Sequence, residues 1–257
     1  MNKSIPRIFI TNDDGYKSVG IKYLKKINNL ISKDIWVFAP EVNQSAKSQS
    51  ITINKNIRIN KLKEKEYIVK GTPCDCVILG LNKLSSFDKK HLLLLSGVNV
   101  GVNLGYDLIY SGTLAAAREG ALNGIKSVAF SIDKRKKKIN WSGLEYYAPK
   151  LISFIIKSRL SKKVFFNINF PSLSMQEIKG IKIVKLGFRK PGNLIKVNNN
   201  NYKIPSDRKI LKTAKPGEDE YELSQGYITI TLHTGNNLLV NNNTLLKFKK
   251  FFRKNFE

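Results

Sequence analysis

The fold of this 257-residue chain is decided by residues 92–120, LLLLSGVNVGVNLGYDLIYSGTLAAAREG. The four leucines form a short apolar run, which is typical of a parallel strand buried on both faces. Glycine or asparagine then occupies every second position from 97 to 105, so the backbone can approach a ligand closely. Residues 110–113 open an alanine-rich helix that Ser111 or Thr113 can cap. Strand, loop and helix start therefore meet beyond the carboxyl end of a strand, where ligands bind in open α/β sheets.

Strand and helix patterns alternate on both sides of this stretch. Helices are expected at residues 19–31, where apolar side chains recur at helical spacing, and at 141–159, where Pro149 should kink or break the helix. Alternation at residues 51–53 and 57–59 predicts a hairpin. The sequence therefore predicts a three-layer α/β/α, Rossmann-like core with a mostly parallel sheet. The other expected strands are residues 8–10, 35–38, 67–69, 128–132 and 164–170.

Residues 71–77, GTPCDCV, carry the marks of a helix start. Thr72 suits the N-cap, Pro73 the first helical position, and Asp75 can complete a capping box, so we interpret the segment as structural. Its two cysteines are the only ones in the chain. They are too close in sequence for an unstrained disulfide, and we interpret them as packing residues of a protein in a reducing compartment.

The character of the sequence changes after Pro171, which we expect to close a self-contained α/β core of residues 1–171. Residues 172–257 form an extension with too little apolar content to fold alone. The extension must pack on its own core or exchange with a second subunit, and we expect both parts to form one functional domain. It comprises strands at 181–186 and 227–232, an asparagine-rich hairpin tip at 198–201 and an amphipathic segment at 245–256.

The formal net charge of +26 raises the alternative of a non-catalytic protein that binds RNA or DNA. Lysine greatly outnumbers arginine, and asparagine and isoleucine are also abundant, a pattern that a coding bias toward A and T would produce everywhere. The clearest basic run, KRKKK at residues 134–138, is therefore interpreted as a solvated loop rather than a groove for a phosphate backbone. We expect no specific nucleic-acid partner.

The N-terminal residues lack the pattern of a signal peptide, and no later apolar run reaches membrane-spanning length. We therefore expect a cytoplasmic protein with no membrane partner.

Oxygen-bearing residues follow three of the expected strands. Asp13 and Asp14 follow the first strand, Ser45 lies in the loop after the second, and Asn99 follows the central one. Two adjacent carboxylates at a strand end need neutralising charge, although TNDDG by itself is equally compatible with a solvated turn. Because no His or Cys accompanies them, the four residues together suit one hard divalent cation, Mg²⁺ or Mn²⁺.

A second set of residues suits an anion beside that cation. The start of the alanine-rich helix, its hydroxyl groups and a nearby asparagine would hold a phosphate, and Asp14 or Asp13 would orient or deprotonate a water for phosphoryl transfer. The P-loop and dinucleotide-binding motifs are absent, and His91 and His233 lie far apart outside these loops. The candidate phosphate-binding residues are Asn103, Ser111, Gly112 and Thr113.

At these residues the chain resembles the SurE family, the survival protein SurE. The resemblance runs in order along nearly the whole chain, and residues 18–20 and the stretch after Thr231 depart from the family pattern. The matching pieces are TNDDG at 11–15, AP and NQS within 39–45, GTPCDCV at 71–77, the central motif at 96–120, and, more weakly, NINFP at 167–171 and GYITIT from 226.

This resemblance implies a metal-dependent nucleotidase that hydrolyses nucleoside 5′- and 3′-monophosphates, and in some members exopolyphosphate, with one Mg²⁺ or Mn²⁺ per subunit. It also implies a homodimer with exchanged C-terminal segments, often paired into a tetramer. By the same resemblance the metal ligands are Asp13, Asp14, Ser45 and Asn99, the two aspartates are catalytic, the phosphate-binding groups are Asn103, Ser111, Gly112 and Thr113, and Asn43 and Asp107 support the site.

Overall fold

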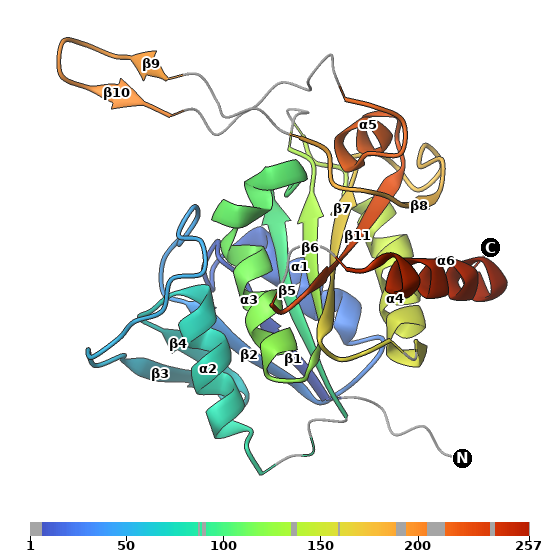
Figure 1. The fold of residues 1–257 in the computed structure, drawn as a ribbon. Helices are drawn as coiled ribbons and strands as arrows, with labels where there is room; N and C mark the ends of the chain where they lie inside the picture. The colour runs from blue at the N-terminus through green and yellow to red at the C-terminus, as the bar shows by residue number, and fades with distance from the viewer. Residues whose placement is uncertain are drawn as a thin grey trace.

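The computed structural model describes residues 7–86, 88, 91–134, 138–158, 160–188, 194–204, 214–236 and 240–256. Within them, nine strands form one sheet in the order β3-β4-β2-β1-β5-β6-β7-β11-β8. Helices cover both faces of this sheet (Figure 1), so the predicted three-layer fold is confirmed. The strands are β1 (Arg7–Thr11), β2 (Ile35–Pro40), β3 (Ile59–Lys63), β4 (Glu66–Val69), β5 (Leu92–Val100), β6 (Lys126–Ile132), β7 (Val164–Phe170), β8 (Ile181–Ile183) and β11 (Ile228–Thr234).

Apolar side chains alternate along the central strands and bury two separate helical layers. Ile8 and Ile10 of β1 pack in the layer that contains α1 and α4, whereas Phe9 packs in the layer that contains α2 and α3. The two helices of each layer contact one another. The helices are α1 (Val19–Asn28), α2 (Pro73–Lys83), α3 (Gly112–Leu122), α4 (Ser142–Lys157), α5 (Asp219–Ser224) and α6 (Asn242–Phe256).

The central strand β5 is longer than the sequence predicts. The four leucines do form its first half, but the strand continues to Val100, with a break in its register against β6 between Ser96 and Asn99. Gly97 has a φ of +127°, and a Cβ there would lie 2.3 Å from the carbonyl oxygen of Phe130. A glycine is therefore needed at position 97 because β6 lies so close to it. The predicted binding loop begins only after Val100, where β5 ends.

The predicted hairpin at residues 51–53 and 57–59 is wrong. Residues 51–58 contain no strand, and the hairpin is formed by β3 and β4, which pair antiparallel. Residue Thr52 is held by helix α2 instead, because its N–H and hydroxyl donate to the Asp75 carboxylate at 2.9 and 2.7 Å. Every side chain of β3 is exposed, as suits a lysine-bearing strand at the edge of a sheet.

Two helices test the predictions made from proline. Helix α2 begins as predicted, with Thr72 at the N-cap and a capping box completed by Asp75. Pro149 is predicted to kink or break α4; the helix continues through Pro149, so the break is wrong, and the kink stays a prediction. Proline removes one N–H donor, but Ala148 and Leu151 on either side are buried in the core and hold the helix in place.

The C-terminal extension returns to the sheet of its own chain. Strand β11 pairs antiparallel with β7 and parallel with β8, which is shorter than predicted. The ring centroid of Phe248 on α6 lies 5.9 Å from that of Phe154 and 5.3 Å from that of Phe166. The asparagine tip joins β9 (Ile195–Lys196) to β10 (Tyr202–Lys203), a separate hairpin that projects from the body (Figure 1). Exchange of segments between subunits stays a prediction.

Candidate active site

The carboxyl ends of β1, β2 and β5 lie at one edge of the sheet, because these strands run parallel. The turn after β1 is shaped by Asn12, whose amide donates to the carbonyl oxygen of Gly15 at 2.9 Å and to the hydroxyl of Ser18 at 2.8 Å. Ser18, where the chain departs from the family pattern, caps helix α1. This turn fixes the backbone that carries Asp13 and Asp14.

Asp13 is buried against the start of helix α3. Only 3% of the residue is exposed, and the hydroxyl of Thr113 donates to its Oδ1 at 2.6 Å. A Cβ on Gly112 would lie 2.8 Å from the Cβ of Asp13, so a larger residue there would displace the carboxylate. Burial raises the pKa of Asp13 to about 6; the Thr113 hydrogen bond opposes this rise and the charge of Asp14 adds to it. A nearby cation would favour the charged form of a carboxyl whose pKa is raised by burial and by a second carboxylate.

Asp14 connects two further loops to the site. The N–H of Val100 and the side-chain amide of Asn43 each lie 3.4 Å from one of its carboxylate oxygens. Asn43 also accepts a hydrogen bond from the N–H of Ser45 at 2.8 Å, so it links Ser45 to Asp14. Burial raises the pKa of Asp14, and the N–H of Val100 and the charge of Lys134 oppose the rise. Lys134 therefore borders the site, while 135–137 of its basic run lie outside the described residues.

Asn99 adds an amide oxygen at the end of β5. Its amide nitrogen donates to the carbonyl of Gly101 at 2.7 Å, which leaves the side-chain oxygen as an acceptor. The loops thus offer two carboxylates, one hydroxyl and one amide oxygen, and these donors fit Mg²⁺ or Mn²⁺ better than a soft metal. Among the described residues there is no group of three or more His, Cys, Asp or Glu side chains that could hold a metal, so a cation here would have two charged ligands.

The start of helix α3 faces the acidic pair. Ser111 caps the helix by accepting the N–H of Leu114, and its own hydroxyl proton can still be donated. Thr113 stabilises the Asp13 carboxylate with both its hydroxyl and its backbone N–H, so the anion held by this residue is Asp13 itself. Asp107 lies in the 3₁₀ helix Gly105–Tyr110, which leads directly to the helix start.

Asn103 is surrounded by buried polar side chains that the sequence analysis did not single out as site residues. Its amide nitrogen donates to the hydroxyl of Ser131 at 2.7 Å, and its backbone contacts Asn167 and Asn169 of β7. A signal was present in the sequence of β7, VFFNINF, which is buried throughout. Asparagines within a buried strand need hydrogen-bond partners, and these two find them in the loop after β5.

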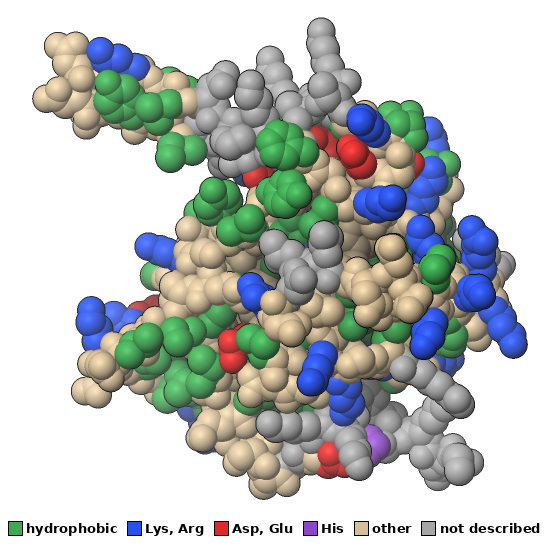
Figure 2. Space-filling view, in the orientation of Figure 1, with side chains coloured by type: hydrophobic (Ala, Val, Ile, Leu, Met, Phe, Trp, Pro, Cys, Tyr) green, Lys and Arg blue, Asp and Glu red, His purple; other side chains and the backbone are tan. Residues whose placement is uncertain are grey.

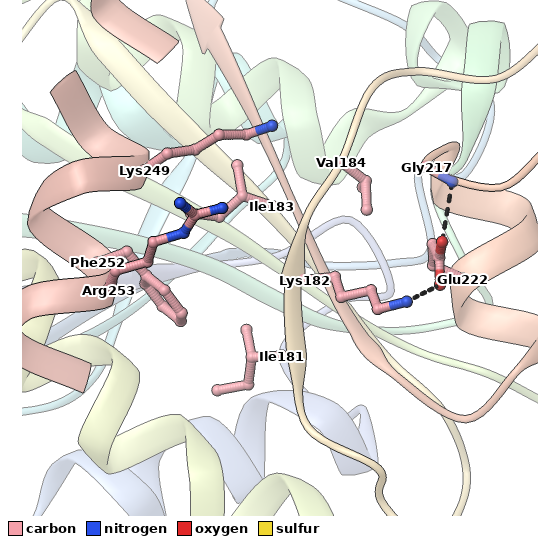
Figure 3. Close-up of a pocket in the computed structure, with 9 residues that line it drawn as sticks. All are labelled: Ile181, Lys182, Ile183, Val184, Gly217, Glu222, Lys249, Phe252 and Arg253. Carbon is pink, nitrogen blue, oxygen red and sulfur yellow. Dashed lines mark hydrogen bonds and ion pairs between the residues drawn. The ribbon is translucent and has the colours of Figure 1, made fainter. Parts of the chain in front are cut away.

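A cavity of about 180 Å³ lies between β8 and α6 (Figure 3). Within it, Nζ of Lys182 pairs with Oε2 of Glu222 at 2.6 Å. Its lining comes from the C-terminal extension, whereas the candidate site is built from the loops after β1, β2 and β5 and the start of α3. The cavity is therefore separate from the candidate site.

Fold and site together define the class of this protein: a three-layer α/β/α protein with an acidic, oxygen-rich candidate site at the carboxyl edge of a mostly parallel sheet. No helix in the described part of the chain is long and apolar enough to cross a membrane. Residues 8–193 match the model of the family described as Survival protein SurE. The chain belongs to the SurE family, and the resemblance seen in its sequence is confirmed.

Individual relatives agree with this assignment over most of the chain. The chain is 39% identical over 230 residues to the 5'-nucleotidase SurE of Paramagnetospirillum magneticum, covering 88% of each protein. It is 38% identical over 229 residues to the 5'-nucleotidase SurE of Wolbachia sp. subsp. Brugia malayi, covering 87% of this chain and 88% of the relative. The crystal structure of the SurE protein from Aquifex aeolicus superimposes with a TM-score of 0.79 at 31% identity, covering 96% of this chain and 100% of the other.

Proposed function

We propose that the chain is a metal-dependent phosphomonoesterase that hydrolyses nucleoside 5′-monophosphates, and also 3′-monophosphates and exopolyphosphate, with release of phosphate. One observation carries this proposal: the Asp13 carboxylate is buried next to Asp14 and against the start of α3, so two adjacent carboxylates and a helix N-terminus meet at one place. The relatives named 5'-nucleotidase SurE support a nucleotide as the substrate.

The loops at the sheet edge would hold one Mg²⁺ or Mn²⁺ per subunit. When bound, such a cation polarises a phosphoryl oxygen and lowers the pKa of a bound water. Asp14 is less buried than Asp13, so we assign it to orient the attacking water and accept its proton, while Asp13 stays anchored to Thr113. The residues that would hold the cation are Asp13, Asp14, Ser45 and Asn99.

The phosphate would bind beside the carboxylates, at the start of α3. The hydroxyl of Ser111 and the N–H of Gly112 can donate to it, and the N-terminus of a helix favours negative charge. Asn103 has a second amide hydrogen that can donate to phosphate while the first is held by Ser131. Lys134, at the border of the site, adds positive charge that attracts an anionic substrate.

The β9–β10 hairpin supports a homodimer or tetramer with exchanged C-terminal segments. A two-stranded hairpin is only marginally stable alone in water, and contiguous exposed apolar side chains mark interaction surfaces. We propose that a second copy of the chain covers this hairpin. Figure 2 shows apolar side chains gathered on it, and the exposed ones are Leu194, Ile195, Val197, Tyr202 and Ile204.

Replacement of either aspartate tests the proposed activity. Asp13→Asn and Asp14→Asn should each lower phosphate release from AMP by at least about 100-fold, because each removes a negative charge from the cation site. Both variants should stay folded, because asparagine has the shape of aspartate. The measurement is phosphate release in Mg²⁺, in Mn²⁺ and in excess EDTA, alongside thermal unfolding.

Glu64→Gln is the matched control, since it removes one carboxylate charge from the exposed turn between β3 and β4. It should keep the wild-type rate. Undiminished turnover in EDTA, or in both aspartate variants, would contradict a metal-dependent phosphomonoesterase.

A further inference from the structure

Two asparagines of β7 hold the backbone of Asn103. Oδ1 of Asn169 accepts the N–H of Asn103 at 2.8 Å, and the side-chain amides of Asn167 and Asn169 both donate to its carbonyl oxygen at 3.0 Å. Asn167 also donates to the hydroxyl of Thr231 on β11 at 3.2 Å. The backbone N–H and carbonyl of Asn103 are thus both satisfied by buried side chains of β7.

Asp219 holds the same loop two residues further on. It lies 114 residues away from Gly105 in sequence, at the start of α5, and it is fully buried. Its Oδ2 accepts the N–H of Gly105 at 2.7 Å, while its Oδ1 accepts the N–H groups of Gly187 at 2.9 Å and Glu220 at 2.8 Å. Gly105 has a φ of +53° and begins the 3₁₀ helix that leads to Ser111.

The contact with Gly105 goes beyond what α5 needs for its own stability. One carboxylate oxygen of Asp219 already accepts N–H groups from the first turn of α5 and from Gly187, and the second oxygen accepts the N–H of Gly105. A backbone N–H held by a carboxylate makes a stronger hydrogen bond than one held by a neutral amide. The loop after β5 is therefore hydrogen-bonded to the C-terminal extension at Gly105.

We propose that Asp219 is a positioning residue for phosphate binding. It acts through Gly105 on the segment from Asn103 to Ser111, whose first residue is held by Asn169. This inference rests on the proposed function, because it assumes that the segment contacts the phosphate of the substrate. It gives the C-terminal extension a part in the site through Asp219, which would not itself touch the substrate.

Asp219→Asn tests this proposal, with Glu222→Gln as the matched control in the same helix. Glu222 is also buried, accepts the N–H of Gly217 at 2.8 Å and pairs with Lys182, so its replacement disturbs α5 without touching the loop. In Asp219→Asn, the KM for AMP and the inhibition constant of inorganic phosphate should rise together by about tenfold, with kcat changed less than about threefold. In Glu222→Gln both constants should stay within about twofold of wild type.

A second readout is amide hydrogen exchange, measured without metal or substrate. The Gly105 amide should exchange faster in Asp219→Asn and at the wild-type rate in Glu222→Gln. If Asp219→Asn does not fold, Asn169→Asp takes its place, because it keeps the acceptor for the Asn103 N–H and loses the donor to the Asn103 carbonyl.

The outcomes separate this inference from the function on which it rests. If the wild type is active but Asp219→Asn, or Asn169→Asp in its place, leaves the KM unchanged, the positioning role alone is overturned. The same holds if Glu222→Gln changes the KM as much as Asp219→Asn does. A wild type that releases no phosphate from AMP in Mg²⁺ or Mn²⁺ overturns both.

Discussion

The contact between Asp13 and Thr113 joins two halves of the candidate site that are 100 residues apart in sequence. It is a buried 2.6 Å hydrogen bond to a carboxylate, the kind whose loss costs most because the charged partner stays buried. The hydroxyl also opposes the rise in the pKa of Asp13 that burial causes. Thr113 therefore favours the ionised form of Asp13, which is the form that binds a cation.

Thr113→Val should lower kcat/KM for AMP by about tenfold and raise the Mn²⁺ concentration needed for half-maximal activity, because it leaves Asp13 without this donor. The measurement is a Mn²⁺ titration of phosphate release. Thr229→Val is the control: Thr229 is buried, and within the described residues its hydroxyl has no hydrogen-bond partner. The control should match wild type in activity and lose no thermal stability. If both variants need the same Mn²⁺ concentration for half-maximal activity, Thr113 has no role in cation binding.

The residues of the candidate site differ in how well the sequence predicts them. Asp13 and Asp14 stand out by residue type at the end of an apolar run, and the glycines and asparagines of the central motif mark a loop. The hydrogen bond from Thr113 to Asp13 could not be predicted from the sequence, because a contact across 100 residues leaves no local pattern. Lys134 is exposed, as expected for a solvated run, and its charge also acts on Asp14, which the sequence alone does not reveal.

At the scale of the element, Lys126 at the start of β6 caps the C-terminal end of helix α4 with its side chain. Its ammonium donates to the carbonyl oxygens of Ile155, Ile156 and Ser158 at 2.9, 3.2 and 2.8 Å. They are carbonyls of the last helical turn, where that of Ile155 also accepts the N–H and the hydroxyl of Ser158, and a cation there also interacts favourably with the helix dipole. Burial, with the nearby charge of Lys162, lowers the pKa of Lys126 to about 8, so the ammonium keeps its charge at pH 7.

Lys126→Met should lower the free energy of unfolding by about 1–2 kcal/mol at pH 7, because three carbonyls lose the ammonium as a donor while the apolar stem is kept. The measurement is urea unfolding. Lys157→Met, in the last turn of the same helix, removes a charge without this set of contacts and should change the value by less than about 0.5 kcal/mol. A similar loss in both variants would show that the charge, and not the capping contact, matters.

The errors of the sequence prediction at this scale share one cause. Strands and helices with a clear period, such as β7 and α1, lie where the pattern places them. The segment at 51–58 alternates like a strand, but side-chain bonds from Thr52 to Asp75 hold it in another conformation. Pro149 is tolerated within α4 because the buried residues beside it decide the outcome. Tertiary contacts override local preference in both cases, and the sequence does not display them.

At the scale of the whole molecule, the sheet ends in two different ways. The β3 edge is short and exposes lysines, which discourages pairing with another sheet. The other edge, β8, is formed by the C-terminal extension, and the β9–β10 hairpin follows it and projects away from the body (Figure 1). The length and composition of the extension do not decide between folding back and exchange. In the structure β11 folds back, while the hairpin keeps an apolar surface exposed.

That surface leads to a prediction about assembly. Val197 and Tyr202 are 62% and 55% exposed, and their burial against a second copy would stabilise an oligomer through loss of apolar surface from water. The double variant Val197→Ser, Tyr202→Ser should therefore raise the dissociation constant of the oligomer by at least about tenfold. Light scattering coupled to size-exclusion chromatography over a range of concentrations measures this directly. Asn199→Ser, at the polar tip of the same hairpin, should leave the mass unchanged. A wild-type chain that is monomeric throughout, or a double variant that assembles as well as wild type, would mean that this hairpin is not the contact between subunits.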